Sequence, residues 1–125
     1  ELDKWFSLYI RLRDADDLGF VECFTSGRFY HYKNIHAGHF MSRKHLSTRW
    51  CDTNVQPQSI GDNLFGQGEQ YKFSVALDAK YGEGTAKELE LTARTIMKVS
   101  RIDYEEKISY YKDLVEKLKK EKGIE

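Results

Sequence analysis

The stretch from Cys23 to Cys51, CFTSGRFYHYKNIHAGHFMSRKHLSTRWC, differs in composition from the rest of the chain. It contains no Asp or Glu, and its charge of +5 comes from Arg28, Lys33, Arg43, Lys44 and Arg49. All four histidines lie in it, namely His31, His36, His39 and His45, with aromatic residues between them. Because nearby carboxylates would repel phosphate, a basic and aromatic segment without them is typical of a polyanion-binding surface. Charge alone leaves nucleic acid and an ordinary basic hairpin equally open.

Strand-forming residues run through this stretch and just before it. Their alternation predicts strands at Phe20–Phe24 and Arg28–Tyr32, and a short third strand at Ile35–Met41. Within the third strand, Gly38 has no side chain, so we expect backbone or a ligand to come close beside His39.

Helical spacing of apolar residues flanks the strands on both sides. Leu2 to Arg13 predicts a first helix, and the acidic turn that ends at Gly19 stops it. Glu69 to Tyr81 predicts a second helix, whose inner side carries Tyr71, Val75 and Leu77.

The C-terminal part predicts two more helices. One opens at a capping box formed by Thr85 and Glu88 and runs to about Ser100. The other begins near Asp103 and ends at Lys122, and its regular apolar stripe leaves a partner helix or a homodimer open. After Trp50, the segments Asp52–Asn54 and Gln56–Ser59 are typical of turns and caps, and the second contains Pro57, the one proline.

The composition of the whole chain narrows the class of protein. Its 125 residues make one domain, and 20 Lys and Arg balance 20 Asp and Glu, so the basic stretch is opposed by a charge of −5 elsewhere. Apolar residues make up 40% of the chain, which excludes a disordered tail. The sequence contains no run of about 18 apolar residues, so no membrane span is predicted. Two cysteines do not make a disulfide scaffold, so we expect a reduced, cytoplasmic protein.

Three polar residues match an arrangement used for phosphodiester hydrolysis. A histidine on a strand takes a proton from water, an asparagine fixes the geometry of the loop or the imidazole, and a divalent cation near a helix neutralises the phosphate. The candidates are His39, Asn54 and Asn63. Spacing alone favours an ordinary surface histidine and two turn-forming asparagines, because such residues are common in loops.

Five segments, in order along the chain, resemble the phage lambda NinG (Rap) recombination endonuclease family. They are Tyr9–Ala15, Cys23–Gly27, Ala37–Arg43, His45–Trp50 and Asn54–Gln58. The resemblance runs from about Leu2 to Gly82, and its most specific part is the block from Ala37 to Gln58.

This resemblance implies a fold and an activity. The family is similar to the HNH, or ββα-metal, nucleases and cuts branched DNA made during recombination. The implied fold is α+β: a single domain over 1–125, with an N-terminal helix at 1–19, an HNH-like core of β-hairpin plus helix at 20–82, and two C-terminal helices at 83–125. The implied setting is the cytoplasm, for a phage or prophage protein in a bacterial host.

The resemblance also assigns roles to residues. His39 falls at the general-base position and counts among the metal ligands, Asn54 is the central asparagine, and Asn63 is a ligand for Mg²⁺ or Mn²⁺. The expected partner is branched DNA, with the backbone held by Arg28, Lys33, Arg43, Lys44, His45 and Arg49. Arg11 and Arg13 either add contacts to DNA or pair with Asp14 or Asp17.

One departure from the family pattern concerns zinc. Family members usually carry two Cys-x-x-Cys pairs that bind a structural zinc, but here the pairs read Cys23-Phe24-Thr25-Ser26 and Ser59-Ile60-Gly61-Asp62. One thiolate of four remains, and serine hydroxyls are poor zinc ligands. We therefore predict no structural zinc, and a buried, apolar role for Cys23.

Smaller departures leave the metal shell open. Glu69 stands where the family tends to have Asn, Cys51 stands where an acidic residue is common, and Gly38 precedes the base where many HNH enzymes have Asp or His. Spacing does not decide whether His36, Asp62 or Glu69 completes the shell. The lost cysteines also fit an alternative function, a module that binds DNA junctions or a recombination partner without cutting.

Overall fold

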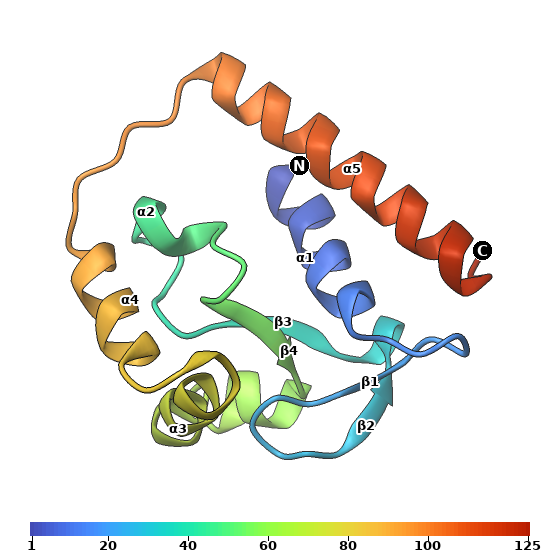
Figure 1. Ribbon diagram of the computed structural model, residues 1–125, viewed down its shortest axis with the longest axis horizontal. Coiled ribbons are helices and arrows are strands. Elements are labelled where there is room, and N and C mark those ends of the chain that lie inside the picture. The colour runs from blue at the N-terminus through green and yellow to red at the C-terminus, as the bar shows by residue number, and fades with distance from the viewer.

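Figure 1 shows a computed structural model that describes residues 1–125. The elements in chain order are α1 (Leu2–Arg13), β1 (Phe20–Glu22), β2 (Phe29–His31), a 3-10 helix η1 (Tyr32–Asn34), β3 (His36–His39), α2 (Leu46–Arg49), β4 (Val55–Gln58), a π-helix η2 (Gly61–Phe65), α3 (Gln70–Tyr81), α4 (Thr85–Ala93) and α5 (Arg101–Lys122). The fold is α+β, as predicted, with two small antiparallel hairpins among several helices.

The two hairpins are β1–β2 and β3–β4, and the second is followed by η2 and α3. In the second hairpin His36 lies opposite Gln58, and His39 lies opposite Val55. The prediction of turn structure at Gln56–Ser59 is wrong for Gln56–Gln58, which belong to β4. Pro57 argues against a strand because it has no N–H to donate, but its carbonyl accepts a hydrogen bond from the Phe24 N–H at 2.8 Å on the other edge of β4.

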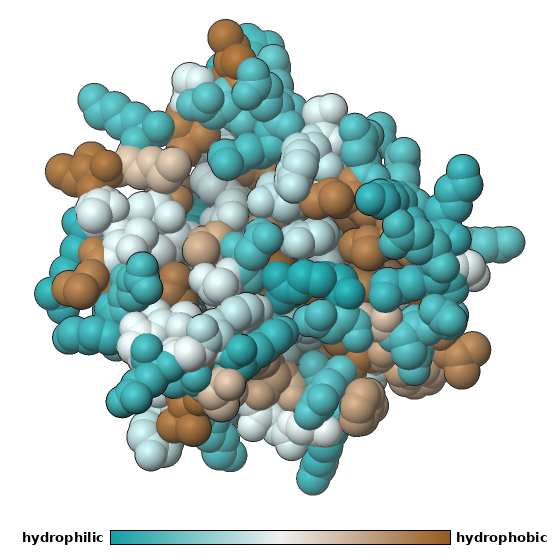
Figure 2. All heavy atoms as spheres, in the orientation of Figure 1, coloured by the Kyte–Doolittle hydropathy of each residue, from teal (hydrophilic) through white to brown (hydrophobic).

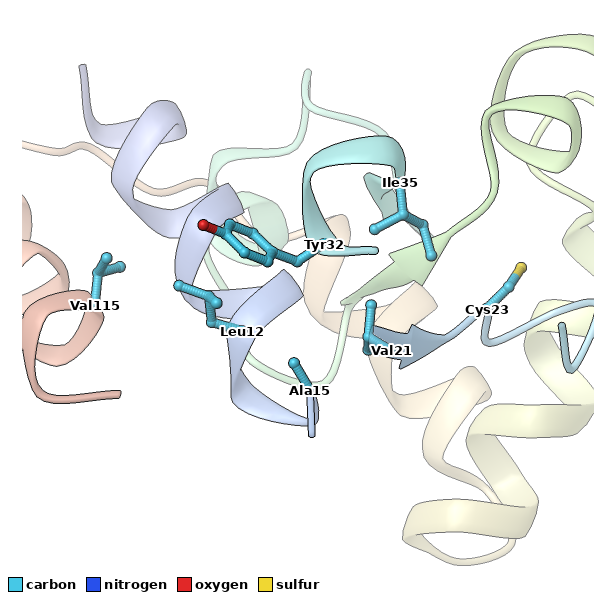
Figure 3. Packing of buried hydrophobic residues seen from close by; sticks show 7 residues of the cluster. All are labelled: Leu12, Ala15, Val21, Cys23, Tyr32, Ile35 and Val115. Carbon is cyan, nitrogen blue, oxygen red and sulfur yellow. The ribbon is translucent and has the colours of Figure 1, made fainter. Parts of the chain in front are cut away.

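Helix α1 packs on the β3–β4 hairpin, and α5 lies along α1 on the side away from the strands (Figure 1). Leu12 of α1, Val21 of β1 and Val115 of α5 belong to one buried cluster (Figure 3). In a second cluster the ring of Tyr111 packs edge-on against Phe6, with 4.9 Å between centroids. The apolar stripe of the last helix is therefore covered by α1 of the same chain.

Helix α3 has the predicted position but a different inner side. Phe73 and Leu77 are fully buried, whereas Tyr71 is 81% exposed and Val75 is 52% exposed. The placing of Tyr71 and Val75 on the inner side is therefore wrong, and that of Leu77 is confirmed. Phe73 decides the orientation, because its ring packs between Phe24 and Phe40.

The helix predicted from Thr85 to Ser100 ends at Ala93, so its second half is wrong. No capping box forms at Thr85, whose hydroxyl donates to the Gly82 carbonyl at 2.7 Å instead. The capping box lies at the start of α5, where Ser100 and Asp103 exchange hydrogen bonds of 3.1 Å. After Ala93 the side chains of Ile96 and Met97 stay exposed, and that of Ile96 is 94% exposed.

The remaining elements agree with expectation in place, although the strands are shorter. The helix at Leu2–Arg13 has the predicted bounds, and the turn glycine Gly19 has a φ of +89°. Helix α2 was not predicted.

No helix combines the length and the apolar character needed to cross a membrane. The face seen in Figure 2 is mostly hydrophilic, with apolar side chains in separate patches.

Candidate active site

Asn54 closes the loop between β3 and β4 from inside. Its side chain is fully buried, and its Oδ1 accepts a hydrogen bond from the Met41 N–H at 2.8 Å. Its Nδ2 donates to the carbonyls of Met41 and Thr48, both at 3.0 Å. One amide thus bonds three backbone groups that no strand ladder pairs, and it ties Met41, before α2, to Thr48 within α2.

His39 stands at the end of β3, beside this loop. Its Nε2 lies 2.9 Å from the Arg49 carbonyl, and because a carbonyl only accepts, Nε2 carries the proton and Nδ1 is the basic nitrogen. Burial lowers the pKa of His39 below its usual value; the nearby Arg43 charge lowers it further, while the hydrogen bond to Arg49 partly opposes the shift. The imidazole is therefore neutral near neutral pH and able to accept a proton.

His39 opens onto a basic cleft. His39, Asn63 and Arg43 line a cavity of about 540 Å³. An adjoining cavity of about 300 Å³ shares Asn63 and Arg43 and adds Arg11, Lys33 and His36. No Asp or Glu lines either cavity. We call the two cavities together the His39 cleft.

Asn63, on η2, brings His36 into this cleft. Its Nδ2 lies 3.1 Å from His36 Nδ1, so the amide donates to the ring and keeps its own oxygen without a partner. The structure thus brings the predicted His39 and Asn63 to one cavity. Asn54 lines neither cavity and instead holds the backbone of the adjacent loop. Since Asn63 and His36 are far apart in sequence, no spacing indicated their contact.

The structure divides the predicted DNA-binding residues among several places. Lys33 and Arg43 line the His39 cleft. Arg28 lines a different cavity, with Lys72 of α3, which the sequence did not single out because only the tertiary fold brings it there. Lys44 is exposed and His45 half-buried, at the start of α2, and neither lines the cleft.

Arg49 is occupied within the protein. Its guanidinium pairs with Asp3 and lies over the Trp50 ring, 5.1 Å from the centroid. Burial alone would raise the pKa of Asp3, but hydrogen bonds from Arg49 and Trp50 hold that pKa below its usual value. The sequence did not decide whether Arg11 and Arg13 contact DNA or pair with a nearby aspartate. Arg13 pairs with Asp14 at 3.5 Å, whereas Arg11 has no carboxylate partner and lines the cleft.

The turns Cys23–Ser26 and Ser59–Asp62, where the resemblance implies zinc-binding cysteine pairs, meet through hydrogen bonds. Cys23 is fully buried, and its Sγ accepts from the Ser59 N–H at 3.1 Å. The Thr25 hydroxyl donates to Asp62 at 2.7 Å, and that carboxylate oxygen lies 4.0 Å from Cys23 Sγ. Burial alone would raise the pKa of the Cys23 thiol, but hydrogen bonds from Ser26, the Ser59 backbone and Thr25 outweigh it and lower the pKa.

These donors do not fit a structural zinc. A closed zinc site needs four good ligands, and this one offers one thiol and one carboxylate that already accepts a hydrogen bond. Nowhere in the chain do three or more His, Cys, Asp or Glu side chains form a group able to hold a metal ion. Both cysteines are free.

The fold and the cleft define a small α+β protein in which a β-hairpin followed by a helix presents a histidine in a basic, carboxylate-free cleft. The chain belongs to the family described as Bacteriophage Lambda NinG protein, whose model matches residues 1–121. This confirms the expected family and extends the match beyond Gly82 into α5. Comparison with curated proteins gives no match, and comparison with solved structures gives none either.

Proposed function

We propose that this protein is a metal-dependent endonuclease that cuts branched DNA made during recombination. The observation that carries the proposal is His39, held neutral with a free Nδ1 at the edge of a basic cleft that contains no carboxylate. Membership of the NinG family supports a recombination-related role in a bacteriophage.

In this mechanism His39 Nδ1 takes a proton from the water that attacks phosphorus. The Arg49 carbonyl holds the ring in the required tautomer and stabilises the imidazolium that results. Lys33 and Arg43 attract the phosphate into the cleft, and the absence of carboxylates there removes repulsion. Backbone contacts of this kind give affinity without base readout, which suits recognition of DNA shape.

The oxygen of the Asn63 amide is a ligand type that Mg²⁺ and Mn²⁺ accept. His36 positions this amide by accepting from its Nδ2, which leaves Oδ1 free. The cation would neutralise charge on the scissile phosphate, with its other ligands from phosphate and water. His39 has one free nitrogen, which cannot serve as base and ligand at once, so we assign it the role of base and assign Asn63 that of ligand.

The protein is further proposed to fold without structural zinc. Elemental analysis of the purified protein is expected to find no stoichiometric zinc, because Cys23 and Asp62 are engaged in hydrogen bonds. A triple variant, Ser26→Cys, Ser59→Cys and Asp62→Cys, provides the positive control, since it gives the two facing turns four thiols. One zinc per wild-type chain would contradict this part of the proposal.

The hydrogen-bonded turns also favour one alternative, a module that binds DNA junctions or a recombination partner without cutting. Cleavage separates the two functions. Labelled four-way junction, flap and linear duplex are incubated with the protein and with Mg²⁺, Mn²⁺ or EDTA. The proposal expects cleavage of the branched substrates that needs metal and disappears in His39→Ala. Junction binding without cleavage under either metal would favour the alternative.

A further inference from the structure

Two neighbouring apolar side chains project from the end of η2 beside the cleft. They are Leu64 and Phe65, the two residues after Asn63. The side chain of Leu64 is 58% exposed and that of Phe65 is 86% exposed. Leu64 lines the same cavity as His39 and Asn63. Exposing large apolar side chains to water is unfavourable. A neighbouring pair of them at the rim of a candidate active site therefore suggests that a ligand covers them.

The turn that carries this pair is held firmly in place. The N–H groups of Gly66 and Gly68 donate to the carbonyls of Gly61 and Asp62, both at 2.8 Å. The Gly68 carbonyl in turn accepts from the buried Gln58 side chain at 2.7 Å. Leu64 and Phe65 are therefore presented by a braced element in a fixed place relative to His39.

The surroundings of η2 are basic. Arg43 and Asn63 lie with Leu64 on one cavity, and Arg28 and Lys72 line another that reaches Gly61 and Asp62. Asp62 is the one carboxylate lining these cavities, and it already accepts a hydrogen bond from Thr25. Glu69, just after η2, pairs with Lys72 at 4.0 Å, so Arg28 and Arg43 are the cations there without a carboxylate partner. An apolar tip in a positive field is complementary to nucleic acid, which offers apolar base faces between phosphates.

Size also favours a base over a protein partner. Two side chains supply far less area than a stable protein–protein interface, which buries on the order of 1,200 Å² or more. The same two side chains match a single base step, and apolar wedges of this kind pack against unstacked bases in many DNA-binding proteins.

We propose that Leu64 and Phe65 form an apolar wedge that packs against the unstacked bases at a DNA branch point and so seats the adjoining strand in the His39 cleft. This inference rests on the proposed function and names the feature of DNA that the site recognises. Bases in a continuous duplex are stacked on both faces, and opening a step there has a cost. At a branch point the face is already free, so the wedge favours branched DNA over duplex.

The test compares binding of a four-way junction with binding of a linear duplex of the same arm sequence, by fluorescence anisotropy in EDTA. Replacing the wedge by Leu64→Ala with Phe65→Ala is expected to weaken junction binding by roughly tenfold to a hundredfold, and to leave duplex binding unchanged. Phe65→Trp alone is expected to keep the preference, because an indole stacks as well as a benzene ring. Ile96→Ala, at an exposed apolar residue between α4 and α5, is the matched control and leaves both affinities unchanged.

An unchanged ratio of junction to duplex affinity in the double variant would overturn the wedge, as would an equal loss on both substrates. Because all three residues are exposed and lie outside the buried clusters, circular dichroism is expected to be the same for every variant. Cleavage plays no part in this measurement. Failure of the nuclease proposal, seen as a bound junction that stays intact with metal, would therefore leave the wedge result standing.

Discussion

Asn54 is the residue on which the geometry of the β3–β4 loop depends. Replacing it by alanine leaves the Met41 N–H and the Met41 carbonyl without partners inside the protein, whereas the Thr48 carbonyl keeps the hydrogen bond from the Cys51 N–H at 3.1 Å. We expect Asn54→Ala to lower the free energy of unfolding by about 2–4 kcal/mol, because each buried unpaired group is costly. Urea denaturation measures this. Asn63→Ala is the control: its side chain is half-buried with one partner, so a loss as large as that in Asn54→Ala would contradict the role given to Asn54.

Because His39 is buried, it makes the free energy of unfolding decrease as the pH falls. Burial in the folded protein lowers the pKa of His39, whereas the pKa of a histidine in the unfolded chain is about 6.5. The unfolded state therefore binds more protons once the pH falls below that value, so the contribution of His39 to stability is complete above it and is lost as the pH falls further. Histidine NMR titration is expected to give His39 a pKa below its usual value, and a raised pKa would count against the proposed neutral base.

At the residue scale, the sequence indicated candidate residues but not the side chains that they contact. Resemblance singled out His39, Asn54 and Asn63, and the fold brings two of them to one cavity. The pairing of Arg49 with Asp3 was not foreseen, because the partners are 46 positions apart and only the packing of α1 brings them together. The burial of Cys23 was foreseen, but its hydrogen bonds were not.

Among the elements, the β3–β4 hairpin depends on a glycine for close packing. A Cβ at Gly38 would lie 2.1 Å from Gln58 Oε1, and the Gln58 side chain is held by hydrogen bonds to Gly68 and Thr25. We expect Gly38→Ala to lower the free energy of unfolding by about 1–3 kcal/mol through overpacking. The sequence predicted that backbone or a ligand comes close at Gly38, but the group that approaches is the Gln58 side chain.

Gly61 provides the matched control for that substitution. A Cβ there meets no atom within 4 Å, so Gly61→Ala is expected to change the stability by less than about 0.5 kcal/mol. Denaturation midpoints of the two variants, compared with the wild type, measure the difference. Equal midpoints would mean that Gln58 moves aside and that the hairpin does not depend on Gly38.

Periodicity predicted the helices that pack along their full length and failed where local signals compete. Helix α1 has a continuous apolar face against α5, and its bounds matched. The pattern after Ala93 looked helical, but Ile96 stays exposed there. Strand β4 was missed because Pro57 is a turn signal, and only the tertiary fold shows that its missing N–H is not needed.

At the scale of the whole molecule, the net charge is zero, but the basic residues have different roles. Arg43 is exposed on the His39 cleft, whereas Arg49 is paired with Asp3. We expect Arg43→Ala to weaken binding to all DNA and to reduce the slope of log affinity against log salt by about 1. Arg49→Ala is expected instead to lower the midpoint of unfolding. Anisotropy titrations over a salt series test this, and an unchanged slope in Arg43→Ala would contradict it.

The central claim is that His39 activates water for phosphodiester cleavage, and single-turnover cleavage of a four-way junction tests it most directly. The rate is measured with Mn²⁺ at saturating protein for the wild type, His39→Ala and a control, His31→Ala, whose ring lies outside the cleft. We predict that the wild type and His31→Ala cut the junction, and that His39→Ala is slower by roughly 10²–10⁴-fold while binding it equally well. A bound junction that the wild type leaves intact, or one that His39→Ala cuts at the wild-type rate, would contradict the claim.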